Sequence, residues 1–243
     1  MRIGILIIGS LLWDRKSERK VWRRDHLDLD SAMPVSAQIN YGRRSQSRGN
    51  TFTMTINPES GFGRAIIVPC RTTQREASTL FAEAEALWRA EMPDAALGRI
   101  SASWGCVGAR FRDQSASSDW SIPWSEYFSA KVASPTHPVN SDGLLEIPWP
   151  SKIADNPIEV DVILATATRA EKQLPNPSEI ADAWIDQDGG DEKYFFENVR
   201  HGIRTPEDIR IWRRIEERMP KWLLNDAYSE ALEVLRAESK SRD

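Results

Sequence analysis

Apolar and alternating residues predict several β-strands in the first two thirds of the chain. Residues 3–8 form an apolar run that ends at Gly9-Ser10, which is typical of a buried strand entering a tight turn. Residues 51–56 alternate polar and apolar side chains, and this period of two predicts a half-buried strand. The side chains expected to face the core in that strand are Phe52, Met54 and Ile56.

Three further strands are predicted. Residues 64–70 follow a turn over Pro58–Gly61, and we expect them to pair with residues 51–56 as a hairpin. Residues 103–111 and 158–165 are the other two candidates, and the glycines in the first of these indicate bulges or a close backbone approach.

Residues 75–91 predict an amphipathic helix with one carboxylate on its apolar face. At about 100° per residue, one stripe contains Ala77, Leu80, Phe81, Ala84, Leu87 and Trp88. Glu91 continues this stripe, whereas Glu83 and Glu85 are expected to point away from its centre. Pro93 disfavours helix at the residue before it, so the helix is expected to end near Glu91. The helix dipole and desolvation should both raise the pKa of Glu91, as a general acid or base requires; the alternative is a glutamate that reaches solvent at a frayed helix end.

Residues 113–150 are rich in proline, serine and tryptophan, so long regular structure is not expected there. A loop of this length is often functional. The alternative is an irregular covering layer held in place by Trp120, Trp124 and Trp149.

The last part of the chain predicts helices. Ser178 is expected to cap one helix, and Thr205-Pro206-Glu207-Asp208 is a second helix start. A final helix is expected over residues 226–238. The apolar residues that repeat at helical spacing after the second start are Ile209, Trp212, Ile215 and Met219.

The composition is that of a globular protein of one large domain or two small ones: 243 residues, 40% hydrophobic and 28% charged. A net charge of −4 argues against a dedicated nucleic-acid binder. No stretch reaches the roughly 18 apolar residues of a membrane span, and the first residues do not resemble a signal peptide. Cys70 and Cys106 are the only cysteines, which excludes a disulfide framework and a cysteine zinc site and favours a cytoplasmic location.

Positive charge is concentrated at the start of the chain, where residues 1–50 carry ten Lys or Arg against five Asp or Glu. Arg43, Arg44 and Arg48 lie together in this segment, and guanidinium groups suit carboxylates and phosphates. The simpler interpretation is a solvated surface loop.

Two other features bear on chemistry. The turn at Gly9, Ser10 and Leu11 can direct backbone N–H groups at an anion, although it lacks the glycine pattern of a phosphate-binding loop. The three histidines, His26, His137 and His201, are scattered and have no metal-ligand spacing.

In their order along the chain, these motifs resemble the γ-glutamylcyclotransferase-like family. Over about residues 3–111 the chain has an apolar strand, the turn Ile8-Gly9-Ser10-Leu11-Leu12-Trp13, further strands, a helix with Leu87 and Glu91 in Leu-x-x-x-Glu spacing, and a strand from Trp104 to Phe111. Members usually carry Tyr where this chain has Ile8. Tyr41 is a candidate to supply the missing hydroxyl.

The resemblance implies an α+β fold built on a mixed β-barrel with flanking helices. The barrel domain is expected over residues 1–165, with a long loop at about 113–150. A helical extension over residues 166–243 is expected to pack on the same domain.

The resemblance also implies a reaction: release of 5-oxoproline from a γ-glutamyl peptide or amine by intramolecular aminolysis, an amide-type lyase reaction. Glu91 is then the catalytic acid and base. A small carboxylate-bearing substrate is expected to bind to the turn at Gly9, Ser10 and Leu11 and to Arg43 and Arg44. No metal or organic cofactor is expected.

The sequence leaves two other classes of function open. Ile8 and the long tail also suit a non-catalytic binding or regulatory protein on the same fold. Alternatively, the tail is an interaction module in which Arg43, Arg44 and Arg48 touch an acidic partner or RNA. No membrane partner is expected, nucleic acid is disfavoured, and a homo-oligomer is left open. A buried Glu91 facing a pocket near Gly9 would favour the enzyme.

Overall fold

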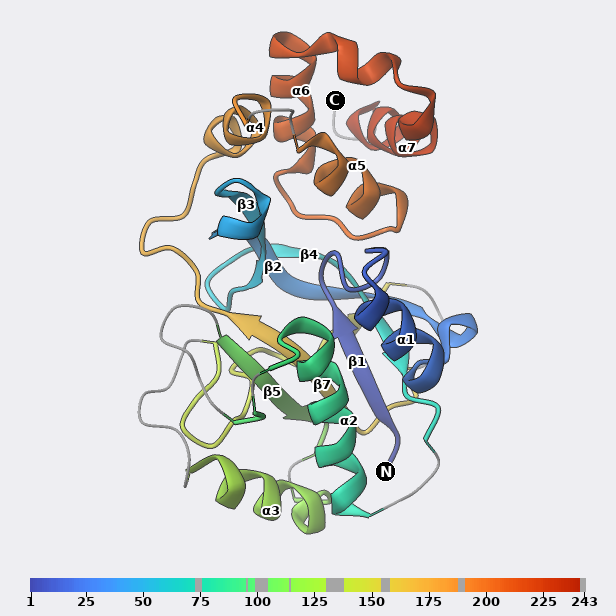
Figure 1. The fold of residues 1–243 in the computed structure, drawn as a ribbon, viewed down its shortest axis with the longest axis vertical. Coiled ribbons are helices and arrows are strands. Elements are labelled where there is room, and N and C mark those ends of the chain that lie inside the picture. Colours follow the sequence, from blue (N-terminus) through green and yellow to red (C-terminus); the bar gives the residue numbers. More distant parts are fainter. Residues whose placement is uncertain are drawn as a thin grey trace.

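The protein is a mixed α+β structure in which helices cover one face of a sheet and a group of helices sits at one end of it (Figure 1). The computed structural model describes residues 1–72, 76–94, 96–98, 105–113, 115–129, 138–153, 158–187 and 191–240. The first residue of the predicted helix at 75–91, residues 103 and 104 of the predicted strand at 103–111, and His137 lie outside these ranges. No helix in the described part of the chain is long and apolar enough to span a membrane.

The strands form a single mixed sheet in the order β3-β2-β4-β1-β7-β5, with β6 paired to β2. Only β1 and β7 run parallel among the described pairs. The strands are β1 (Ile3–Ile7), β2 (Met33–Ser45), β3 (Thr51–Ile56), β4 (Phe62–Pro69), β5 (Gly105–Phe111), β6 (Ser151–Lys152) and β7 (Val162–Thr168).

The predicted barrel is not closed. Within the described strands, β3 and β5 are the two ends of the sheet and do not pair with each other. The predicted hairpin between residues 51–56 and 64–70 is also wrong, because β2 lies between β3 and β4 and pairs with both. Its first part, from Met33 to Gln38, pairs with β4, and its second part, from Ile39 to Ser45, pairs with β3.

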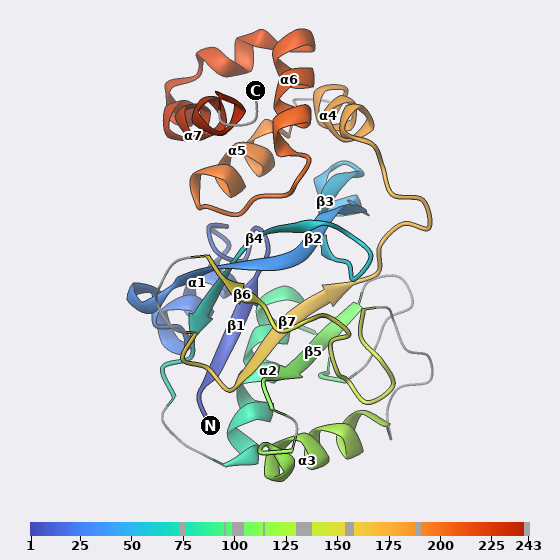
Figure 2. The ribbon, with the colours of Figure 1, turned by 180° about the vertical axis from the view of Figure 1, so that it is seen from behind.

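Strand β3 is buried along its whole length, contrary to the half-buried strand expected from its alternation. The reason is the helical extension, whose helices run from α4, which begins at Pro177, to α7, which ends at Lys240, and which covers β3 (Figures 1 and 2). Side chains of the extension bind the free edge of this end strand. Trp184 Nε1 donates to the Phe52 carbonyl at 3.1 Å, and Tyr194 Oη accepts from the Met54 N–H at 3.0 Å. An edge strand otherwise leaves such groups unpaired.

Two helices pack together on one face of the sheet: α1 (Ser17–His26) and α2 (Ala77–Glu91). Helix α2 ends at Glu91, as predicted. Its buried stripe contains Leu80, Ala84, Leu87 and Trp88, also as predicted. Glu83 does not point away as expected: it is buried, and its Oε2 lies within hydrogen-bond distance of His26 Nδ1, at 2.9 Å.

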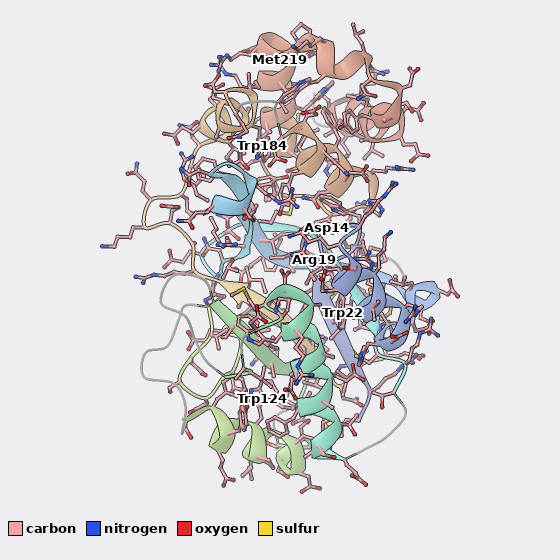
Figure 3. All side chains as sticks on the ribbon, in the orientation of Figure 1. Asp14, Arg19, Trp22, Trp124, Trp184 and Met219 are labelled. Carbon is pink, nitrogen blue, oxygen red and sulfur yellow. The ribbon has the colours of Figure 1, made fainter. Side chains whose placement is uncertain are left out.

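The segment expected to be a loop contains helix α3 (Ser118–Ser129), with Pro123 inside it. Trp120, Trp124 and Phe128 recur every four residues and form its buried face. Burial of three aromatic side chains therefore outweighs the hydrogen bond that Pro123 cannot donate. Trp124 lies in the lower part of the molecule in Figure 3.

The helical extension consists of α4 (Pro177–Ile185), α5 (Glu192–Arg200), α6 (Asp208–Arg218) and α7 (Ser229–Lys240), with short 3-10 turns between α6 and α7. Its helical character and the start near Asp208 are as predicted. Asn176, not Ser178, caps α4, in a capping box with Glu179. Helix α5 was not predicted.

Candidate functional site

A cavity of about 770 Å³ lies where the sheet meets the helical extension. The turn after β1, the end of β2, the last residue of α2 and the start of α5 all line it. The predicted site residues that border it are Gly9, Ser10, Leu11, Arg43, Arg44 and Glu91. The structure thus brings all the predicted site residues to one place, while their chemical roles remain predictions.

The guanidinium group of Arg19 connects the turn to the carboxylate. It donates to Ser10 Oγ at 3.0 Å, to Asp14 Oδ2 at 2.7 Å and to Glu91 Oε2 at 2.5 Å. The Arg19 and Glu91 side chains are only 11% and 12% exposed, so this ion pair is shielded from water. Figure 3 shows Asp14 and Arg19 beneath the helical extension. The carboxylate of Glu91 therefore faces a pocket beside Gly9.

Glu91 lies on the final turn of α2, where Met92 N–H still bonds to the Trp88 carbonyl and Pro93 follows. Burial raises the pKa of Glu91 above its ordinary value, and the positive charges of Arg19 and Arg43 oppose that rise. The upward direction is the one expected from the sequence. Within the described residues, Arg19 is the one hydrogen-bond partner of this carboxylate, and it uses Oε2.

The carbonyl groups of the turn at Gly9, Ser10 and Leu11 all accept hydrogen bonds. The Gly9 carbonyl accepts from Leu12 N–H and that of Ser10 from Asp14 N–H, while Arg23 donates to the Leu11 carbonyl. No acceptor for the N–H groups of the three turn residues is found in the part of the chain that the structure describes. N–H groups gathered in a turn can form an anion-binding concavity, so these three are suited to oxygens of a ligand.

The sequence predicts that the three arginines share one surface loop, but the structure places them on different elements. Arg43 and Arg44 belong to β2, and Arg48 belongs to a short 3-10 turn after it. Arg44 is exposed; it lies 4.0 Å from the centre of the Phe52 ring and donates to a backbone carbonyl. Arg43 is partly buried, and this burial lowers its pKa while the charge of Glu91 opposes the change.

Tyr41 does not supply a hydroxyl at the turn, which corrects that expectation. It is 2% exposed, does not line the cavity, and packs against Trp184 with ring centres 5.0 Å apart. Tyr194 of α5 lines the cavity instead. Its hydroxyl oxygen lies 2.9 Å from the point that a Cβ at Gly9 would occupy.

Sequence reasoning missed Arg19 and Tyr194. Arg19 shares a helical face with Trp22 and Arg23, and this spacing was the available signal for α1. The available signal for α5 was the apolar cluster from Tyr194 to Phe196 followed by Val199. Neither signal points to a cavity.

No group of three or more potential metal ligands occurs among the residues that the structure describes. Comparison of the chain with family models, with curated proteins and with solved structures finds no match.

Proposed function

We propose that the protein is a γ-glutamyl cyclotransferase-like enzyme, which releases 5-oxoproline from a γ-glutamyl peptide or amine. The observation that carries this proposal is the meeting, on one cavity, of a shielded Glu91 with a turn whose three N–H groups have no acceptor among the described residues. The resemblance in motif order supports it independently.

The proposed reaction needs proton transfer and orientation. The α-amine of the γ-glutamyl group attacks its own γ-carbonyl carbon, so that a C–N bond forms and the carbonyl oxygen becomes an oxyanion. The turn N–H groups of Gly9, Ser10 and Leu11 stabilise this oxyanion. Glu91 takes the proton that the amine loses and returns it to the leaving nitrogen as the original amide bond breaks. Because the nucleophile is tethered, little further chemistry is required of the protein.

Arg19 has two effects on this mechanism. It fixes the Glu91 carboxylate at the cavity through Oε2. It also opposes the pKa rise that burial causes, and so favours the ionised form of Glu91 that acts as a base.

The test is release of 5-oxoproline from a panel of γ-glutamyl amides and dipeptides, measured by mass spectrometry. We expect Glu91→Gln to lower turnover by about 10²-fold or more. Glu85→Gln is the matched control, because Glu85 is exposed on the same helix and pairs with Arg89. Full activity of the Glu91 variant would refute the assignment.

A second candidate is a non-catalytic protein that binds small carboxylates on the same fold. The observation favouring it is the Arg19–Glu91 contact of 2.5 Å, which occupies half of the carboxylate. Binding of carboxylates without any 5-oxoproline release from the panel would favour this candidate.

A further inference from the structure

Arg48 is held between two carboxylates and two aromatic rings at the edge of the cavity. Its guanidinium nitrogens lie 3.8 Å from Asp14 and 3.6 Å from Asp191. Its Cζ lies 4.8 Å from the centre of the Tyr194 ring and 5.7 Å from that of Trp13. Both carboxylate distances exceed hydrogen-bond length, so the group is oriented without donating a hydrogen bond to either acid.

The helical extension fixes the turn that carries Arg48. Thr51 Oγ1 lies within hydrogen-bond distance of the Arg48 carbonyl, at 2.9 Å, and of Asp191 Oδ2, at 2.7 Å. Gly49 has a φ of +63°, and a Cβ there would come within 2.1 Å of the Gln187 side chain. Two residues that follow Arg48 in this turn, Gly49 and Thr51, therefore lie against Gln187 and Asp191 of the extension.

The neighbouring arginines are placed differently. Arg44 is exposed and its Nη1 donates to the Asn50 carbonyl at 3.0 Å. Arg43 faces the charge of Glu91. The Arg48 side chain, by contrast, is 22% exposed and stacked, so its planar fork is pre-organised for a planar oxyanion.

We propose that Arg48 is a carboxylate-binding residue of the cavity, distinct from the turn N–H groups, and that the helical extension completes this subsite by fixing the Arg48 turn. The group it binds is a carboxylate of a small ligand. This inference rests on the proposed function for the nature of the ligand, but it concerns binding and not turnover.

Glutarate is the probe, titrated by calorimetry into the full chain. Arg48→Lys keeps the charge but loses the fork, so we expect the Kd for glutarate to rise about tenfold or more. Arg89→Lys is the matched control and should bind like the parent, because Arg89 is exposed, pairs with Glu85 and does not line the cavity. If the parent binds no glutarate, or if Arg48→Lys binds like the parent, the inference is overturned.

The role of the extension is tested with two glycines of the same backbone type. Gly49→Ala strains a left-handed residue and meets Gln187, whereas Gly202, with a φ of +76°, has nothing within 4 Å of its Cβ position. We expect Gly49→Ala to lose glutarate affinity and Gly202→Ala to keep it, with folding of each checked by circular dichroism. Equal affinities for the two variants would overturn the role of the extension.

The two proposals fail separately. Glutarate binding that depends on Arg48, without release of 5-oxoproline, would refute the proposed enzyme activity and support the Arg48 subsite. Turnover that depends on Glu91 but not on Arg48 would support the enzyme activity and refute the Arg48 subsite.

Discussion

Replacing Gly9 with alanine places a methyl group against the hydroxyl group of Tyr194. The new Cβ would lie 2.9 Å from Tyr194 Oη and 3.8 Å from the ring carbon Cζ. Tyr194 is 3% exposed, and its Oη accepts a hydrogen bond from the Met54 N–H. The phenol can therefore move aside only by leaving that buried N–H unpaired.

The size of the effect follows from two opposing terms. An unpaired buried N–H costs about 1–3 kcal/mol. A Gly→Ala change at a backbone that alanine can adopt stabilises by about 0.4–1 kcal/mol through the unfolded chain. Gly9 is not among the residues with positive φ, so this gain applies. We expect Gly9→Ala to destabilise the protein by about 1–2 kcal/mol.

The effect of Gly9→Ala on stability should change from destabilising to stabilising once the Tyr194 hydroxyl group is removed. In a Tyr194→Phe background the former clash is replaced by a ring carbon at ordinary contact distance, and the Met54 N–H is already unpaired. Gly9→Ala should then stabilise by about 0.4–1 kcal/mol. The coupling between the two positions is therefore about 2 kcal/mol, which is typical of residues in direct contact.

The assay is urea unfolding of the parent, both single variants and the double variant, followed by tryptophan fluorescence. Tyr228→Phe combined with Gly9→Ala is the control, because Tyr228 lies in the extension against Phe196 and does not line the cavity. Additive effects at positions 9 and 194, within about 0.5 kcal/mol, would refute the contact between the turn and α5.

Three further changes test the packing of the site and the extension. Burial raises the pKa of Glu91 above its ordinary 4.5, so its stabilising contribution is full below pH 4.5 and is lost as pH rises through the folded-state pKa. Glu91→Gln should then have a higher Tm than the parent at pH 7 and no advantage at pH 4; an equal difference at both pH values would contradict this. Asp208→Ala should cost about 3–5 kcal/mol in urea unfolding, because Asp208 is 0% exposed and pairs with the buried Arg204, and a cost below about 1 kcal/mol would show that the pair is dispensable. Gly63→Ala puts a Cβ 2.3 Å from the Arg204 carbonyl oxygen and should loosen the extension, seen as faster trypsin cleavage; unchanged proteolysis would exclude that.

The local pattern of apolar and polar residues predicted the elements whose burial can be inferred from nearby residues in the sequence. The apolar run at the start became β1, and the amphipathic helix ended at Glu91, where Pro93 follows. The same logic failed where one element covers another. The alternation of β3 predicts a solvent-facing side, yet Thr53 is 8% exposed, because the strand contacts both α4 of the extension and β7 of the sheet.

The strand β2 and the helix α5 were missed for related reasons. In β2 the apolar residues Val35, Ala37 and Ile39 alternate with polar ones, but the strand continues into Arg43 and Arg44, which suggest a surface loop. Its length lets it pair with β4 at one end and β3 at the other, which the predicted hairpin does not allow. Helix α5 spans nine residues and has no capping side-chain hydrogen bond to mark its start.

The sequence by itself determined which residues of the site are candidates for chemistry. The turn at Gly9 and the carboxylate of Glu91 each follow from a short segment: a strand ending in Gly-Ser, and a helix whose apolar stripe ends in an acid. Such inferences depend on contacts within one or two turns of chain, and local periodicity encodes them.

Only the tertiary structure decided what surrounds these residues. Arg19 reaches Glu91 across 72 positions of sequence, and Tyr194 reaches Met54 across 140. The order of the strands and the covering of β3 depend on contacts of the same kind. Long-range contacts depend on the total burial and hydrogen bonding of the folded chain and not on any one segment. No local pattern therefore predicts that an arginine and a tyrosine from distant helices both lie at the turn that begins at Gly9.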